Sequence, residues 1–229
     1  MANPNIRNFA ELIPNELLHE SGKTFYSGRL AFSKPCPLYV LGVNPGGDPT
    51  TQLEETVQRH TQQVLDERPE NWSAYRDESW YGATEGFYGM APRVLHLLRK
   101  LQIDPGEVPS SNLVFVRSRR EEKIKQSLKR FADLCWPFHE AVLQLLKPRV
   151  VLCMGATAGD YVREKVGANQ LITTFVEQNN REWKSRSYTD ANGLCVVVAT
   201  HPSIADWTAP ATDPSDLVID ALGRIQTFY

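Results

Sequence analysis

Two short apolar runs, each ending abruptly in polar residues, constrain this chain more than any other feature of its sequence. Residues 38–43 are followed by Asn-Pro-Gly-Gly, and residues 196–199 are followed by Thr-His-Pro-Ser. A short apolar run bounded by turn-forming residues is typical of a buried strand. Each run therefore brings a polar side chain, Asn44 or His201, to the carboxyl end of a strand, where α/β proteins build their sites. If the two strands are neighbours, both side chains face one pocket.

Strands and helices alternate along the rest of the sequence. Apolar runs predict further strands at 113–116 and 150–154, and residues 172–188 are expected to form a hairpin or an irregular strand. Apolar residues at helical spacing, together with turn and capping residues, predict helices near 9–19, 52–65, 90–101, 126–146 and 156–166, and one from 213 onward. This alternation favours an α/β three-layer sandwich, with a mostly parallel central sheet flanked by helices. We expect one domain over residues 1–229.

Composition limits the class of protein. The 229 residues are 41% hydrophobic and 23% charged, and the net charge of −2 gives no global attraction to nucleic acid. No run of about 18 apolar residues or apolar leader is found, so we expect no membrane partner and a cytoplasmic location. The cysteines at positions 36, 135, 153 and 195 form no Cys-x-x-Cys pair, so reduced, buried thiols are expected.

Two segments carry strong local charge. An insertion at about 48–86 holds nine acidic and three basic residues, and its four aromatic residues predict a packed rather than disordered segment. Its charge would repel a phosphate backbone if it faced one. The opposite pattern follows soon after, in a basic cluster formed by Arg117, Arg119, Arg120, Lys123, Lys125, Lys129 and Arg130. This cluster is either a phosphate-contact surface or a solvated helix face.

Taken in order, several motifs resemble those of the uracil-DNA glycosylase superfamily. Residues 42–46, Gly-Val-Asn-Pro-Gly, are similar to the first motif of its mismatch-specific and single-strand-selective branches. Residues 135–158 resemble the iron–sulfur branch, in which a Cys-x-Pro-Phe helix leads to a Lys-Pro strand and a Gly-Ala-x-Ala turn. Residues 201–203, His-Pro-Ser, match the second motif of the superfamily. The resemblance implies a uracil-DNA glycosylase-like α/β fold. Taken alone, each motif is weak evidence and is more typical of a turn, a cap or a core position; the order of the set along the chain carries the resemblance.

The resemblance also implies roles in removing a flipped base. His201 would stabilise the uracil anion that leaves, and Asn44 would position the attacking water where other branches carry a carboxylate. The Asn112 amide matches the O4/N3–H edge of uracil. Phe87 would stack on the base, with Tyr88 as the second choice. The remaining residues that the resemblance assigns to the substrate pocket are Gly42, Val43, Pro45 and Ser203.

Contacts with DNA are implied for a second group of residues. Ile204 lies where the superfamily carries an apolar wedge, and Trp207 could stack on a neighbouring base, although both could instead pack against the C-terminal helix. The other residues in this group are Gly46, Gly47, Arg117, Lys123 and Lys125.

One departure from the iron–sulfur branch affects cofactor content. Only Cys135 matches a position that ligates the cluster, and one thiolate cannot hold a cluster that needs four ligands. We therefore expect no cofactor and no metal. The expected activity is hydrolysis of the N-glycosidic bond of uracil, or of a related deaminated base in DNA, by a monomer. Two alternatives stay open: a weak or inactive member that binds a base or nucleic acid, and a small-molecule hydrolase on the same scaffold.

Overall fold

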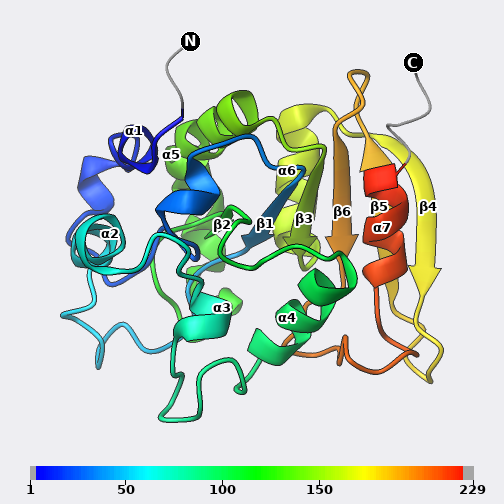
Figure 1. Ribbon diagram of the computed structural model, residues 1–229, viewed down its shortest axis with the longest axis horizontal. Helices are drawn as coiled ribbons and strands as arrows, with labels where there is room; N and C mark the ends of the chain where they lie inside the picture. The colour runs from blue at the N-terminus through cyan, green and yellow to red at the C-terminus, as the bar shows by residue number, and fades with distance from the viewer. Residues whose placement is uncertain (1–3, 224–229) are drawn as a thin grey trace.

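A six-stranded sheet organises the computed structural model, which describes residues 4–223 (Figure 1). The strand order is β2-β1-β3-β6-β5-β4, in which β2, β1, β3 and β6 are mutually parallel and β5 is antiparallel to both of its neighbours. The prediction of an α/β fold with a mostly parallel sheet is confirmed. The strands are β1 Leu38–Gly42, β2 Ser110–Asn112, β3 Val150–Met154, β4 Gln170–Val176, β5 Lys184–Thr189 and β6 Cys195–Ala199.

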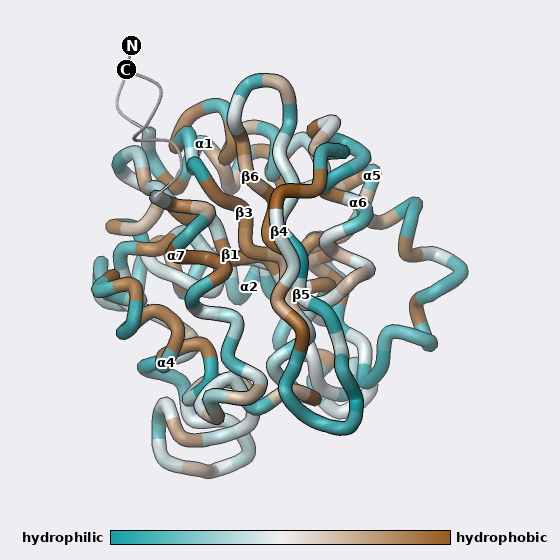
Figure 2. Tube along the Cα trace, turned by 90° about the vertical axis from the view of Figure 1, so that its right-hand side faces the viewer, coloured by the Kyte–Doolittle hydropathy of each residue, from teal (hydrophilic) through white to brown (hydrophobic). Residues whose placement is uncertain are grey.

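Helices cover both faces of the sheet. Alternate residues of β1 divide between two cores: Tyr39 and Leu41 pack with α1, α5 and α6, whereas Leu38 and Val40 pack with α4 and α7. The apolar residues of β1, β3 and β6 therefore lie inside the molecule (Figure 2). No helix within residues 4–223 has the length and apolar character to cross a membrane. The helices of these two layers are α1 Ile6–Ala10, α5 Glu121–Leu146, α6 Ala156–Val166, α4 Ala91–Lys100 and α7 Ser215–Gly223.

The strand predicted at 113–116 is displaced. The observed strand, β2, ends at Asn112. The apolar residues that follow it are buried outside the strand, and the Leu113 and Val114 amides donate to the Gly42 and Val43 carbonyls at 2.9 Å each. Two serines occupy the buried strand because hydrogen bonds to a distant segment satisfy their polar groups: the Ser111 hydroxyl donates to the Thr24 carbonyl at 2.6 Å, and the Ser110 amide donates to the Ser27 hydroxyl at 3.0 Å. Asn112 is thus the last residue of its strand.

Several helix boundaries also differ from the predictions. The helix expected at 9–19 is α1 followed by a short 3₁₀ turn, η1 (Asn15–Leu17), because Pro14 interrupts it. A second such turn, η2, spans Arg29–Phe32. α5 begins five residues earlier than expected and continues through Pro137. The insertion contains α2 (Val57–Gln62), a π-helical turn η3 (Gln63–Glu67) and α3 (Ala74–Asp77).

The packed insertion and the hairpin follow their predictions. Trp72 and Tyr75 of the insertion are each 1% exposed, so the segment is anchored in the core. β4 and β5 form the expected antiparallel hairpin. β4 runs in the same direction as β6, so the turn between β4 and β5 lies at the edge where the parallel strands end (Figure 1).

Candidate functional site

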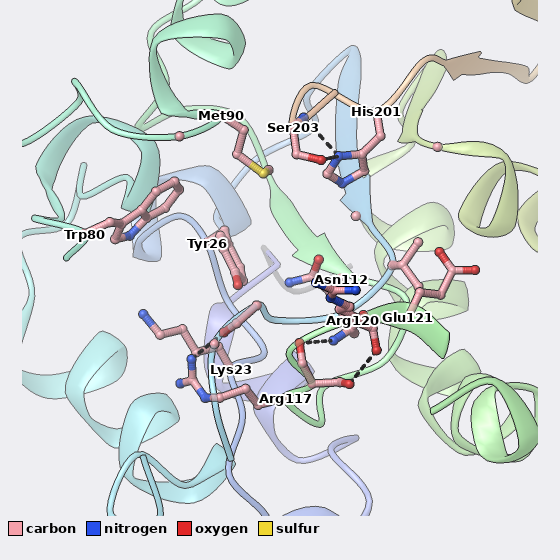
Figure 3. Close-up of a pocket in the computed structure, with 18 of the residues that line it drawn as sticks. Lys23, Tyr26, Trp80, Met90, Asn112, Arg117, Arg120, Glu121, His201 and Ser203 are labelled. Carbon is pink, nitrogen blue, oxygen red and sulfur yellow. Dashed lines mark hydrogen bonds between the residues drawn. The ribbon is translucent and has the colours of Figure 1, made fainter. Parts of the chain in front are cut away.

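A cavity of about 2020 Å³ opens at the carboxyl ends of the parallel strands. Asn44, which follows β1, Asn112, which ends β2, and His201, which follows β6, all line it. β1 and β6 are not neighbours, because β3 lies between them, but both strands end at the same edge. Figure 3 shows His201 and Asn112 beside one open space, which Tyr26 also faces. The structure thus brings together the three polar residues that the sequence singled out.

The hydrogen bonds of His201 fix its tautomer. The Ser203 backbone N–H donates to His201 Nδ1 at 3.1 Å, and the Ser203 hydroxyl lies 2.8 Å from the same nitrogen. Because a backbone N–H can only donate, Nδ1 is unprotonated and the proton of the neutral ring is on Nε2. Burial lowers the pKa of His201, and nearby Glu121 opposes this effect. The ring therefore presents a neutral N–H donor on the edge turned away from Ser203.

The Asn44 amide is oriented by its own turn. Its Nδ2 donates to the Pro45 carbonyl at 2.8 Å and to the Ser118 carbonyl at 3.5 Å. The Ser118 backbone N–H donates to the Pro45 carbonyl at 3.0 Å, and this hydrogen bond closes the turn. With its nitrogen committed to backbone carbonyls, the side chain keeps Oδ1 as an available acceptor. Such an oxygen can hold a water molecule.

Asn112 is fitted closely against the end of β1. A Cβ atom on Gly42 would lie 2.2 Å from Asn112 Oδ1, so only glycine leaves room for this amide. Asn112 is 5% exposed, and no hydrogen bond within the described residues satisfies its Nδ2. Burial raises the pKa of the Tyr26 phenol, and the nearby Asn112 amide partly offsets this without reaching hydrogen-bond geometry. A buried, unsatisfied amide beside a cavity is suited to a ligand.

A buried histidine that the sequence analysis missed supports these strand ends. Tyr39 of β1 donates its hydroxyl to His139 Nδ1 at 2.8 Å, and His139 Nε2 donates to the Leu113 carbonyl at 3.2 Å. His139 thus links α5 to β1 and to the segment after β2. Burial lowers the pKa of His139 to about 4, so the ring is neutral at pH 7. Its sequence context, in the middle of an amphipathic helix, gave no signal of this role.

The aromatic residues around the cavity differ from those expected. Phe87 is 77% exposed and is not among the lining residues, whereas Tyr88 lines the cavity and contacts Tyr81 with ring centroids 5.3 Å apart. Tyr26 and Trp80, which no motif indicated, also line it. Trp80 is fixed by Glu78, which accepts from the indole N–H at 2.9 Å and pairs with Lys23 Nζ at 2.9 Å.

Arg117 is buried rather than presented on the surface. It is 4% exposed and donates to the Gly46 carbonyl at 2.6 Å, to a Glu55 carboxylate oxygen at 2.7 Å and to the Ser21 hydroxyl at 3.1 Å. These contacts brace the Gly46–Gly47 turn, and both glycines line the cavity. The phosphate contact expected of Arg117 is therefore not favoured by its position. Sequence reasoning could not anticipate this burial, because the three partners come from distant segments.

Other expected DNA contacts lie on the surface. Lys123 and Lys125 are exposed on the first turns of α5, and Ile204 is 55% exposed at the mouth of the cavity. The stacking role considered for Trp207 is wrong, because this side chain is fully buried and donates its indole N–H to the Thr200 carbonyl at 2.9 Å. Trp207 instead anchors the loop that carries His201. The expected pocket residues Gly42, Val43 and Ser203 line the cavity, and Pro45 contributes its carbonyl to Asn44.

The cysteines lie away from any cluster of ligands. All four are buried, and burial raises the pKa of the Cys135 thiol to about 12. In the part of the chain that the structure describes, no group of three or more histidine, cysteine or acidic side chains is placed to bind a metal ion. The absence of a cofactor stays a prediction for the purified protein.

Neither a protein-family model nor a curated protein matches this chain. The function is therefore argued from the chemistry of the site. The cavity offers one neutral N–H donor, one oriented amide oxygen and one buried amide that can both donate and accept. Within this group, nothing is a strong base at neutral pH. The arrangement can bind a flat polar heterocycle, stabilise a departing anion and orient a water molecule.

Proposed function

We propose that this protein is a DNA glycosylase that hydrolyses the N-glycosidic bond of uracil, or of a related deaminated base, on a uracil-DNA glycosylase-like fold. The observation that carries the proposal is the convergence of Asn44, Asn112 and His201 at one edge of the sheet, with His201 in the tautomer that donates from Nε2. The order of the motifs along the chain supports the same assignment.

His201 suits the leaving group of this reaction. A glycosylase takes its target base out of the stack, and bond cleavage then leaves negative charge on the base and positive charge on the sugar. A neutral N–H donor beside the base O2 stabilises that anion without requiring proton transfer. Removing one such donor typically costs about 10²–10³ in rate. Burial lowers the pKa of His201 and so favours the neutral ring that this role requires.

Asn44 would supply orientation rather than basicity. Its Oδ1 accepts a hydrogen bond from a water molecule, while the bonds from Nδ2 to backbone carbonyls hold the side chain in place. The attacking water is thus positioned beneath the anomeric carbon. The bond from carbon to the base breaks, the bond from carbon to the water oxygen forms, and the water's proton passes to solvent. Since an amide does not abstract the proton, we expect turnover slower than that of a carboxylate-assisted site.

Asn112 would select the base. Uracil presents a carbonyl acceptor at O4 beside a donor at N3, and an amide complements this pair, whereas cytosine presents the opposite pattern. A buried donor such as Asn112 Nδ2 penalises any base that leaves it unsatisfied. The lack of a Cβ atom at Gly42 leaves the space that Asn112 Oδ1 occupies.

A binding module without efficient cleavage is the second candidate. It is favoured by Asn44, because a site without a carboxylate can recognise a base and still hydrolyse it slowly. The same residues would then hold the base, and His201 would serve recognition alone. This candidate differs from the glycosylase only in the chemical step.

One assay separates the candidates. Purified protein is incubated with oligonucleotides that contain uracil, hypoxanthine, xanthine or only normal bases, and abasic sites are then cleaved with alkali. Strand breaks at the modified base alone support the glycosylase. Retarded but intact DNA in a gel supports the binding module. If the DNA is neither cleaved nor retarded, both candidates are excluded. A parallel incubation with the His201→Ala variant controls for a contaminating enzyme.

A further inference from the structure

The turn between β4 and β5 contributes an aromatic surface that no motif indicated. Trp183, immediately before β5, is 40% exposed and lines the same cavity as His201. Ile204, which follows the His-Pro-Ser segment, lines it as well and is 55% exposed. Two large apolar side chains thus remain open to solvent at the mouth of a polar cavity, although the rest of this turn is hydrophilic (Figure 2). Exposed apolar side chains gathered at a cavity mark a contact surface.

Arg181 fixes Trp183 in position. Its guanidinium lies 4.2 Å from the centre of the Trp183 ring and is held by the buried Glu177 carboxylate at 2.8 Å. The same guanidinium donates to the Ile204 carbonyl at 2.6 Å, and this bond joins the turn to the loop of His201. The indole is therefore a fixed platform rather than a loose surface residue. Because Arg181 takes one face of the ring, a single face stays available for a ligand.

Two cations lie close to this platform in the sequence and line the same cavity. They are Lys184 and Arg186, at the start of β5, and neither forms an ion pair within residues 4–223. Other cations around the cavity form ion pairs: Lys23 pairs with Glu78, and Arg117 pairs with Glu55. An aromatic face beside uncommitted cations is the combination with which proteins hold single-stranded nucleic acid: the base stacks while the phosphate is neutralised.

We propose that Trp183 stacks on the unpaired base that flanks the flipped nucleotide, and that Lys184 and Arg186 bind the adjoining phosphate. The proposal rests on the function proposed above for the same cavity and specifies its substrate as a single strand. Insertion between base pairs needs both faces of a ring, whereas Trp183 offers one. A base without a partner can turn onto that one face at little cost.

The test measures binding of a labelled single strand of roughly 15 nucleotides, a length that one such site spans. The probe carries one 2′-fluorinated deoxyuridine, whose bond to the base resists cleavage, so that binding is measured without turnover. Two further probes replace the nucleotide on the 5′ or the 3′ side of the uracil by an abasic spacer. We expect Trp183→Ala to weaken binding of the full probe by about tenfold, the loss of one stacked base.

The spacer probes make this test specific. On the probe that lacks the stacked base, wild type and Trp183→Ala should bind equally, and Trp183→Phe should retain most of the affinity for the full probe. Leu171→Ala, which truncates an exposed side chain of β4 in the same hairpin, should bind as wild type does. Lys184→Ala should weaken binding of every probe and reduce its salt dependence. Thermal unfolding confirms that each variant is folded.

The outcomes distinguish this proposal from the function on which it rests. Equal affinity of wild type and Trp183→Ala for the full probe, or the same penalty on all three probes, would overturn the platform even if uracil is excised. Failure of the wild type to bind any single strand would do the same. A penalty confined to the probes that retain the flanking base, without excision of natural deoxyuridine, would keep the platform and remove the glycosylase.

Discussion

The floor and the mouth of the cavity are built in different ways. On the floor, Asn44 and His201 are oriented by backbone groups, and Asn112 is buried with its Oδ1 in the space that Gly42 leaves open. At the mouth, Ile204 and Trp183 are exposed side chains, one on the loop after β6 and the other on the turn before β5. Groups held at fixed positions suit transition-state stabilisation, whereas exposed groups suit adjustable contacts with a long substrate. We therefore expect changes on the floor to alter rate and changes at the mouth to alter affinity.

The acidic insertion is less repulsive than its composition indicated. Its residues do line the cavity, but six of its nine carboxylates form ion pairs, and four of those pairs use cations from outside the insertion. Much of its charge is thus neutralised within the fold. The carboxylates in ion pairs are Asp48, Glu54, Glu55, Asp66, Asp77 and Glu78.

The largest expected effect is on the floor. His201→Ala and Asn44→Ala should each slow single-turnover excision of uracil by about 10²–10³, since each removes a group aligned with the reacting atoms. Affinity for the uncleaved strand should change much less. Unchanged rates in both variants, with normal thermal unfolding, would contradict the expectation that the floor of the cavity determines the rate.

Asn112→Asp should have the next largest effect. The change replaces a buried donor by a second acceptor, so the carboxylate cannot donate to O4 of uracil. Excision of uracil should fall by about 10–100-fold, the usual consequence of losing one buried hydrogen bond to a substrate. Comparison of single-turnover rates checks this. If both proteins excise uracil equally fast, Asn112 is a structural residue.

His139 tests how firmly the floor is supported. Its folded pKa of about 4 lies below the ordinary value of 6.5, so protonation favours the unfolded chain. The stability that it contributes is complete above about pH 6.5 and is lost as the pH falls toward 4. Between pH 7 and pH 5 this amounts to about 2 kcal/mol.

The variant that tests this pH dependence is His139→Gln, because glutamine retains a donor and an acceptor but does not titrate. Urea unfolding at the two pH values should show a smaller loss of stability for the variant than for wild type. An identical pH dependence in both proteins would assign the acid sensitivity to other groups, such as His60, whose pKa burial also lowers.

The smallest effect is expected at the basic start of α5. Lys123→Ala combined with Lys125→Ala should weaken binding of every sequence several-fold and reduce the slope of log affinity against log salt by roughly 0.7 for each phosphate that is no longer neutralised. Lys34→Ala is the control, because this lysine pairs with Glu107 and lies outside the basic cluster. A salt dependence equal to that of wild type would make the cluster a solvated helix face.

The sequence predicted those parts of the fold whose signal is local. β1, β3 and β6 are uninterrupted apolar runs, and each appears where it was expected. β2 was misplaced because Ser110 and Ser111 are polar and give no apolar signal, and their hydrogen-bond partners, Thr24 and Ser27, lie far away in the sequence. The hairpin of β4 and β5 was also predicted from its local pattern. Its position beside the cavity could not be predicted, because that position depends on the order of the strands in the sheet.

The candidate site was predictable to the same degree. Asn44, Asn112 and His201 stand out because polar residues beside apolar runs are visible in a linear sequence. Tyr26 and Trp183 do not stand out, since their exposure to the cavity depends on strand order and on partners far along the chain. Phe87 was preferred to Tyr88, but Tyr88 is the one that lines the cavity. The sequence does not show in which direction each of two neighbouring aromatic side chains points.

The strand order has a consequence for how the protein is made. β2 pairs with β1 across the whole insertion, and β6 reaches the sheet only after most of the chain has been synthesised. Such non-local pairing slows folding and leaves strand edges open in the nascent chain. Asn44 and Asn112 leave the ribosome long before His201, so a partly synthesised chain has no complete site. The complete candidate site is therefore acquired in one late step, when β6 closes against β3.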